Sequence, residues 1–217
     1  LLGRGDRETA DRAASTALYS SIFVGAAVIL CAVIFLKPLL KCLGATDSIL
    51  PYAVTYAGIY VVSSIFNVFN VTMNNIVTSE GAARTTMCVL LTGAAFNMVL
   101  DPVFIYVLKL GVAGAAIATA ISQAVSTLIY LYYVISGRSM FSFRFRNCCF
   151  SNEIMSEILK IGIPTLAFQL LTSLSITMIN MQAKPYGDSV IAGMGAVTRM
   201  ISLGSLMVFG FIKGFQP

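Results

Sequence analysis

Six long apolar stretches alternate with short polar segments along the chain. They cover residues 15–36, 49–77, 85–110, 112–136, 158–183 and 189–212. Each is long enough to cross a bilayer as a helix, which takes about 20 apolar residues. Barrel strands would be shorter and would alternate apolar with polar positions. We therefore predict an all-α polytopic membrane bundle with six transmembrane helices.

Polar side chains form a stripe along the second stretch, residues 49–77. Their spacing of three and four residues places them on one helix face. Such a face is costly against lipid, so it either lines a water-filled cavity or forms hydrogen bonds to a neighbouring helix. The stripe comprises Tyr56, Tyr60, Ser63, Asn67, Asn70 and Asn74.

The third stretch carries a carboxylate followed by a helix breaker. Asn97 and Asp101 are four residues apart and share a helix face. Pro102 has no N–H, so the carbonyl of Met98 loses its helical partner. Oxygen ligands beside a helix discontinuity suit a proton or a small cation such as Na⁺. The alternative is that Asp101 lies near the end of its helix and is simply hydrated.

The fourth stretch contains small residues at four-residue spacing, which allow close helix packing. Gly114, Ala118 and Ser122 form one such row, and Thr119 belongs to another. Thr119 is about as far beyond the connecting turn as Asp101 is before it. An antiparallel hairpin therefore predicts that Thr119 joins Asn97 and Asp101, unless its hydroxyl bonds only to its own helix.

The last two stretches add further candidates for the lining of a cavity. Arg199 lies in the middle of an apolar stretch and requires an anion, a carbonyl or water. Its partner is either Asp101 or a group outside this chain, and we favour the second. The cavity-lining candidates are Tyr60, Ser63, Asn67, Asn70, Gln169, Thr172, Asn180 and Arg199.

The composition restricts the chemistry that the chain can perform. It is 58% hydrophobic and 11% charged, without histidine, and its mean hydropathy of +0.87 is typical of an integral membrane protein. A single intramembrane aspartate does not supply the paired carboxylates, or the nucleophile and base, of an intramembrane enzyme. The five cysteines show neither disulfide-framework nor zinc spacing. We expect neither an enzyme nor a cofactor, and no metal apart from a coupling ion.

Basic residues are distributed unequally between the loops. When successive loops are assigned to opposite sides of the membrane, one side has nine Lys and Arg residues and the other has four. The remaining one, Arg199, lies within a predicted helix. The positive-inside rule then places the N-terminal segment, residues 137–157 and the C-terminal end in the cytoplasm. In residues 137–157, Arg144 and Arg146 alternate with phenylalanines. This pattern favours a segment at the lipid headgroups over nucleic-acid binding.

Several motifs resemble those of the multidrug and toxic compound extrusion (MATE) family, in the expected order. The longest is FNMVLDPVFIYVLKLGVAGAAIATAISQ at residues 96–123. Shorter ones are GRGD at 3–6, SEGAAR at 79–84, LKIGIP at 159–164, YGD at 186–188 and GFQP at 214–217. The resemblance covers essentially the whole chain. Thr78 departs from it, because many relatives place an arginine there.

The resemblance implies twelve helices in two six-helix lobes, in a protein of roughly double this length. Residues 1–136 would belong to the N-lobe, from the end of its second helix through its sixth. Residues 137–157 would form a cytoplasmic inter-lobe linker, and residues 158–217 would begin the C-lobe. We therefore expect a piece of a longer, multi-pass protein of the cell membrane that is monomeric when complete.

The resemblance also implies roles for particular residues. Asn97, Asp101 and Thr119 match positions linked to H⁺ or Na⁺ coupling, while a further acidic residue of that network would lie on a helix before this chain. The implied activity is secondary active efflux of small organic, often cationic, substrates across the bilayer. Two alternatives remain: an exporter of lipid-linked or polysaccharide substrates, whose cavities tend to be more basic, and a membrane fragment that does not transport.

Overall fold

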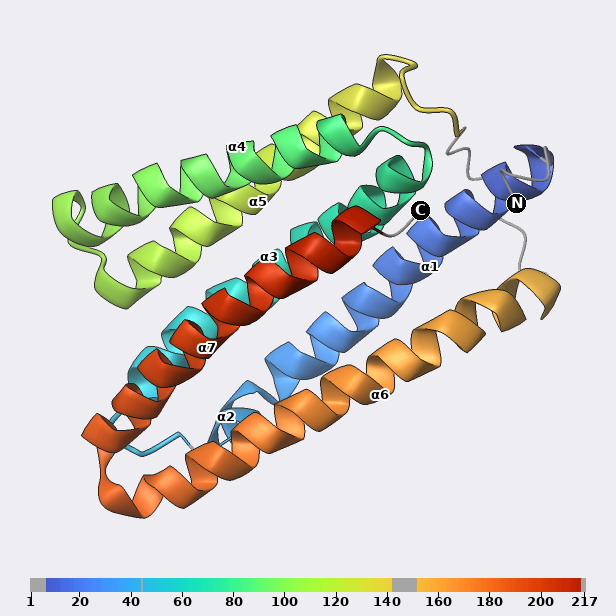
Figure 1. The fold of residues 1–217 in the computed structure, drawn as a ribbon. Helices are drawn as coiled ribbons and strands as arrows, with labels where there is room; N and C mark the ends of the chain where they lie inside the picture. The colour runs from blue at the N-terminus through green and yellow to red at the C-terminus, as the bar shows by residue number, and fades with distance from the viewer. Residues whose placement is uncertain (1–6, 44, 142–151, 216–217) are drawn as a thin grey trace.

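The computed structural model describes residues 7–43, 45–141 and 152–215, and within these ranges the chain is helical and contains no strand (Figure 1). Six helices are long and apolar enough to cross a membrane, so the predicted six-span all-α bundle is confirmed. The elements are α1 (Arg7–Ile34), α2 (Leu36–Cys42), α3 (Leu50–Ser79), α4 (Ala83–Pro102), the π-helical turn η2 (Val103–Val107), α5 (Gly111–Ile135), α6 (Asn152–Ala183), the 3₁₀ turn η4 (Lys184–Tyr186) and α7 (Asp188–Phe215).

The helix boundaries differ from the prediction in four places. Helices α1 and α6 begin at Arg7 and Asn152, before the expected residues 15 and 158, so part of the expected linker 137–157 is helical. Hydropathy marks where lipid begins rather than where a helix begins, which explains both differences. The short helix α2 was not predicted, and the third stretch is not one α-helix, because α4 gives way to η2 after Pro102. Arg144 and Arg146 lie outside the described residues.

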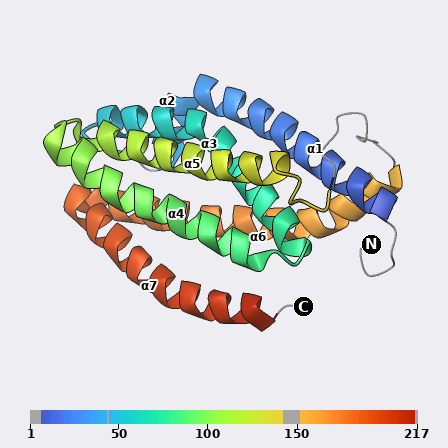
Figure 2. The same cartoon turned by 90° about the horizontal axis from the view of Figure 1, so that it is seen from above.

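Helices α1, α3, α5 and α4 pack side by side in that order. The α3–α5 contact is the most extensive, and α1 covers α3 while α4 covers α5. Helices α6 and α7 form a hairpin closed by η4 and pack on each other there. Seen from above, α7 lies apart from α1, α3 and α5 (Figure 2). The two groups of helices are thus separate packing units.

The buried core is concentrated at one end of the α1–α5 bundle, which we call the core end. Here α1 and α4 begin, and α3 and α5 end. Met73, Val77, Val89 and Tyr130 are at most 1% exposed. Elsewhere the helices expose large apolar side chains, as expected for surfaces that face lipid.

The hairpin of α4, η2 and α5 depends on a close backbone contact. A Cβ atom on Gly114 would lie 2.8 Å from both the carbonyl carbon and the oxygen of Phe104 in η2. Gly114, Ala118 and Ser122 are all buried, so the predicted row of small packing residues is confirmed. Only glycine permits this approach, which fixes the depth of α5 relative to Asp101.

Candidate functional site

Asn97, Asp101 and Thr119 come together near the η2 end of the α4–α5 hairpin. Asn97 Nδ2 lies 3.4 Å from Asp101 Oδ1 and 3.3 Å from Thr119 Oγ1, so one amide group bridges the two helices. All three side chains are partly buried. The neighbourhood expected from hairpin depth is therefore present.

The hydrogen bonds in this cluster have a definite direction. The Thr119 hydroxyl donates to the carbonyl of Ala115 at 2.9 Å, so its only proton is used within α5. Its oxygen accepts from Asn97, whose second amide hydrogen points to the Asp101 carboxylate. The Thr119 hydroxyl thus bonds to its own helix and also joins Asn97. The Asn97 amide thus presents its nitrogen, and not Oδ1, to both partners.

The helix discontinuity after Asp101 takes the form of a π-helical turn. Pro102 keeps helical dihedral angles, with φ −60° and ψ −38°, but has no N–H for the carbonyl of Met98. Beyond it, the N–H of Leu108 bonds to the carbonyl of Val103 at 2.9 Å, five residues back. A freed carbonyl consequently lies one turn before the proline, on the helix that carries Asp101.

A cavity of about 560 Å³ lies between α3, α4 and α5. Asn97 and Thr119 line it, so the cluster adjoins the cavity, while Asp101 is not among the lining residues. The lining contains no charged side chain and combines amides and hydroxyls with a few apolar groups. Its residues are Asn67, Asn70, Val71, Asn74, Asn75, Val89, Leu90, Gly93, Ala94, Asn97, Thr119, Ser122, Gln123, Ser126 and Tyr130.

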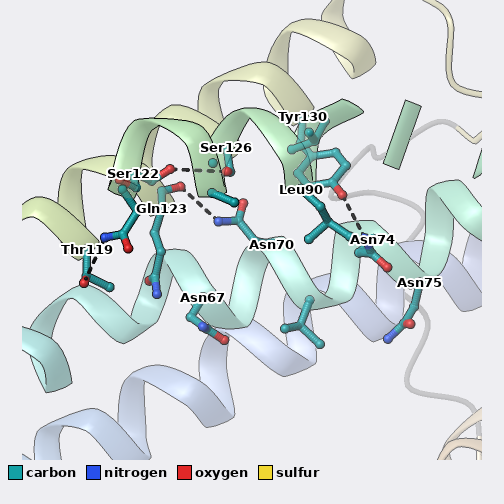
Figure 3. A pocket seen from close by; sticks show the side chains of 15 residues that line it. Asn67, Asn70, Asn74, Asn75, Leu90, Thr119, Ser122, Gln123, Ser126 and Tyr130 are labelled. Carbon is teal, nitrogen blue, oxygen red and sulfur yellow. Dashed lines mark hydrogen bonds between the residues drawn. The ribbon is translucent and has the colours of Figure 1, made fainter. Parts of the chain in front are cut away.

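The asparagine stripe of α3 both lines the cavity and bonds to α5. Asn70 and Asn74 extend towards Gln123 and Tyr130 (Figure 3). Asn70 Nδ2 donates to the backbone carbonyl of Gln123 at 2.9 Å, and Thr127 donates to Asn70 Oδ1 at 3.0 Å. Asn74 Nδ2 lies 3.2 Å from Tyr130 Oη. These residues therefore line the cavity and also bond to a neighbouring helix; that the cavity is filled with water stays a prediction.

Known proteins resemble this chain along its whole length. Residues 1–103 match the family model MatE. The multidrug export protein MepA of Staphylococcus aureus (strain bovine RF122 / ET3-1) is 29% identical over 217 residues, covering 100% of this chain and 48% of MepA. A multidrug resistance MATE family transporter solved in an inward-facing conformation has a TM-score of 0.88 and 31% identity, covering 94% of this chain and 47% of that one. The chain therefore resembles MATE family transporters over about half of their length.

The MATE likeness holds for more than one conformation of the known structures. An outward-facing MATE transporter gives a TM-score of 0.84 with 31% identity over 96% of this chain and 47% of its own. The MepA of Staphylococcus haemolyticus (strain JCSC1435) is 28% identical, again over 100% of this chain and 48% of its own length. The chain spans about half the length of the curated relatives it matches.

Several predicted lining residues lie away from the cavity. Ser63 is buried and donates to the carbonyl of Tyr60 at 2.9 Å, within its own helix. Tyr60 is 39% exposed and stacks on Tyr56, with ring centroids 5.9 Å apart. The remaining four candidates are on α6 and α7, outside this cavity: Gln169, Thr172, Asn180 and Arg199.

The sequence analysis missed a polar row on α5 that faces the cavity. Ser122, Gln123, Ser126 and Tyr130 line it. Their spacing of three and four residues carried the signal, but only Ser122 was interpreted, as a small packing residue. Because α3 and α5 pack most extensively, a polar stripe on α3 predicts a matching one on its partner.

Proposed function

We propose that this chain forms part of a MATE antiporter that exports small organic, often cationic, molecules in exchange for H⁺ or Na⁺. The observation that carries the proposal is the position of Asn97. It bonds to Asp101 and Thr119 and also lines the uncharged cavity. The similarity to multidrug export proteins supports the substrate class.

Asp101 is the group proposed to bind the coupling ion. A proton would neutralise its carboxylate and weaken the bond from Asn97, since hydrogen bonds to charged groups are the stronger ones. Sodium would instead gather oxygen ligands from Asp101, Thr119 and a rotated Asn97. Among the described residues, no group of three or more Asp, Glu, Cys or His could hold a metal ion. Sodium would therefore combine the Asp101 carboxylate with the neutral oxygen ligands of Thr119 and Asn97.

The proposed transport cycle uses the link between the ion and the cavity. An ion can drive export only if it has different affinities for the two conformations or for the substrate-bound and empty states. Asn97 contacts both regions, so a change in its orientation alters the donors and acceptors that face the cavity. The uncharged lining supports this activity over a polysaccharide exporter, which would need basic residues.

The remaining organisation is proposed on the same basis. Residues 1–136 would form the N-lobe part, 137–157 the inter-lobe connection and 158–217 the beginning of the C-lobe. Gln169, Thr172, Asn180 and Arg199 would face a central cavity between the lobes. The N-terminal segment, the connection and the C-terminal end would lie in the cytoplasm, because the basic residues concentrate there.

The decisive experiment removes the charge of Asp101 in the complete transporter. Asp101→Asn and wild type are reconstituted in liposomes, and efflux of a cationic dye is followed under an imposed H⁺ or Na⁺ gradient. We expect the variant to lose its dependence on the gradient, since the amide cannot take up a proton. Asp47→Asn, in an exposed loop, is the matched control and should behave as wild type. Gradient-driven efflux that is unchanged in Asp101→Asn would remove Asp101 from the coupling site.

A further inference from the structure

A carboxylate at the core end ties the chain after α5 to the end of α3. Glu80 Oε1 accepts hydrogen bonds from the Ser139 hydroxyl and, at 3.1 Å, from the backbone N–H of Met140. Glu80 Oε2 accepts from Tyr133 Oη at 3.2 Å. One side chain therefore contacts the last turns of α5 and the segment that follows it. We call these contacts the Glu80 clamp.

Local helix energetics do not explain an acidic residue at this position. Glu80 is the C-cap of α3, where the negative end of the helix dipole disfavours a carboxylate. The adjacent turn is well defined: Gly81 has φ +83°, and the N–H of Ala82 bonds to the carbonyl of Val77 at 3.2 Å. Glu80 thus projects from a fixed turn, and its three donors offset the unfavourable position.

The segment held by the clamp continues into the hydrophobic core. Gly137, with φ +67°, reverses the chain after α5. Ser139 Oγ also accepts from the N–H of Phe141 at 3.3 Å. Phe141 is 9% exposed and belongs to the core cluster with Tyr133 and Met73. The chain consequently leaves α5, folds back through Ser139 and inserts Phe141 into the core.

We propose that Glu80 is a positioning residue that fixes where the chain leaves the α1–α5 bundle on its way to α6. Its bond to Tyr133 continues a line of contacts between α3 and α5 that includes Asn74 with Tyr130. Residues 139 and 140 are therefore linked through Glu80 and Tyr133 to the two helices that carry the cavity. This role concerns the position of the chain, and it holds whether or not the transport proposal is correct.

Two substitutions at Glu80 separate hydrogen-bond geometry from charge. In Glu80→Gln the amide oxygen can still accept from Ser139 and Met140, and the amide hydrogens can donate to Tyr133 Oη. Glu80→Ala removes every one of these partners. We therefore expect the alanine variant to release residues 139–141 and the glutamine variant to retain them largely in place. A purely electrostatic role would make both variants equally defective.

The release of residues 139–141 is measured by hydrogen exchange and by spin-label distances on the purified chain in nanodiscs. In Glu80→Ala, exchange of the Met140 amide should accelerate on the order of 10- to 100-fold, as expected for loss of a bond to a charged group. Nitroxides at Met140→Cys and Ala83→Cys, both exposed positions, are introduced after replacement of the native cysteines. Their distance distribution should broaden in Glu80→Ala and stay narrow in Glu80→Gln and in the control Ser136→Ala.

Ser139→Ala provides a second test in case Glu80→Ala fails to fold. It should accelerate exchange at Met140, and combining it with Glu80→Ala should add little, because the bond from Ser139 is among the contacts that Glu80→Ala already removes. The proposal is overturned if Met140 exchanges at the wild-type rate in either single variant, if the two effects add as independent changes, or if Glu80→Gln releases the segment as fully as Glu80→Ala.

Discussion

Replacing Gly114 by alanine tests whether the α4–α5 hairpin is held by backbone contact. The added Cβ would lie 2.8 Å from the carbonyl atoms of Phe104, inside the 3.4 Å at which ordinary contact begins, so the helices must separate by some 0.6 Å. Overpacking of this kind costs about 1–3 kcal/mol. The helix propensity of alanine returns roughly 0.5–1 kcal/mol. We expect a net loss of up to about 2.5 kcal/mol of unfolding free energy, and a loss of about 1–3 kcal/mol relative to a glycine-to-alanine change in a helix where the new Cβ meets nothing.

Two other glycines supply matched controls for this prediction. In Gly93→Ala the new Cβ meets the Ser126 hydroxyl, which can rotate away, so the loss should be smaller. In Gly162→Ala on α6 nothing lies within 4 Å, so stability should be unchanged or slightly higher. Thermal unfolding of the purified variants in one detergent, followed by circular dichroism, ranks their stabilities. A Gly114→Ala melting temperature equal to that of Gly162→Ala would refute the close contact.

Two further predictions concern the α3–α5 contact and the turn before α5. A double-mutant cycle of Asn74→Leu and Tyr130→Phe should give a coupling of about 0.6 kcal/mol in unfolding free energy, and additive effects would contradict the hydrogen bond between them. Gly111 and Lys109 both have φ +54°, and a Cβ on Gly111 would meet nothing within 4 Å. Gly111→Ala should therefore lower the unfolding free energy by about 1–2 kcal/mol through backbone strain alone, whereas Lys109→Gly should not lower it. A Lys109→Gly variant less stable than Gly111→Ala would contradict the turn geometry.

The sequence predicted those features that depend on lipid exposure and on helix periodicity. Apolar length identified the six spanning helices, because the bilayer imposes that length whatever the packing. Counting residues on either side of one tight turn was enough to place Thr119 beside Asn97. The spacing of Asn70 and Asn74 likewise predicted a polar face towards a cavity or a neighbour, and it serves both.

Other features depend on contacts that no local pattern contains. Glu80 bonds to residues 53 to 60 positions away, and its own surroundings in the sequence resemble an ordinary helix end. The π-helical turn after Pro102 depends on which carbonyl groups accept from the following N–H groups, and this turn packs closely against the distant Gly114. Ser63 has the spacing of a lining residue, yet the packing of its helix buries it at 5% exposure.

The shared position of Asn97 makes the proposed coupling energetically reasonable without a long pathway. Coupling between two ligands typically amounts to about 1–3 kcal/mol. A hydrogen bond to a charged group contributes about 1.5–3 kcal/mol, so gain or loss of the single bond from Asn97 to Asp101 is of sufficient size. The same amide cannot donate to Asp101 and turn that hydrogen towards a ligand in the cavity. Ion binding at Asp101 would therefore change whether this hydrogen is available to a ligand in the cavity, and that dependence is the link which the proposed coupling requires.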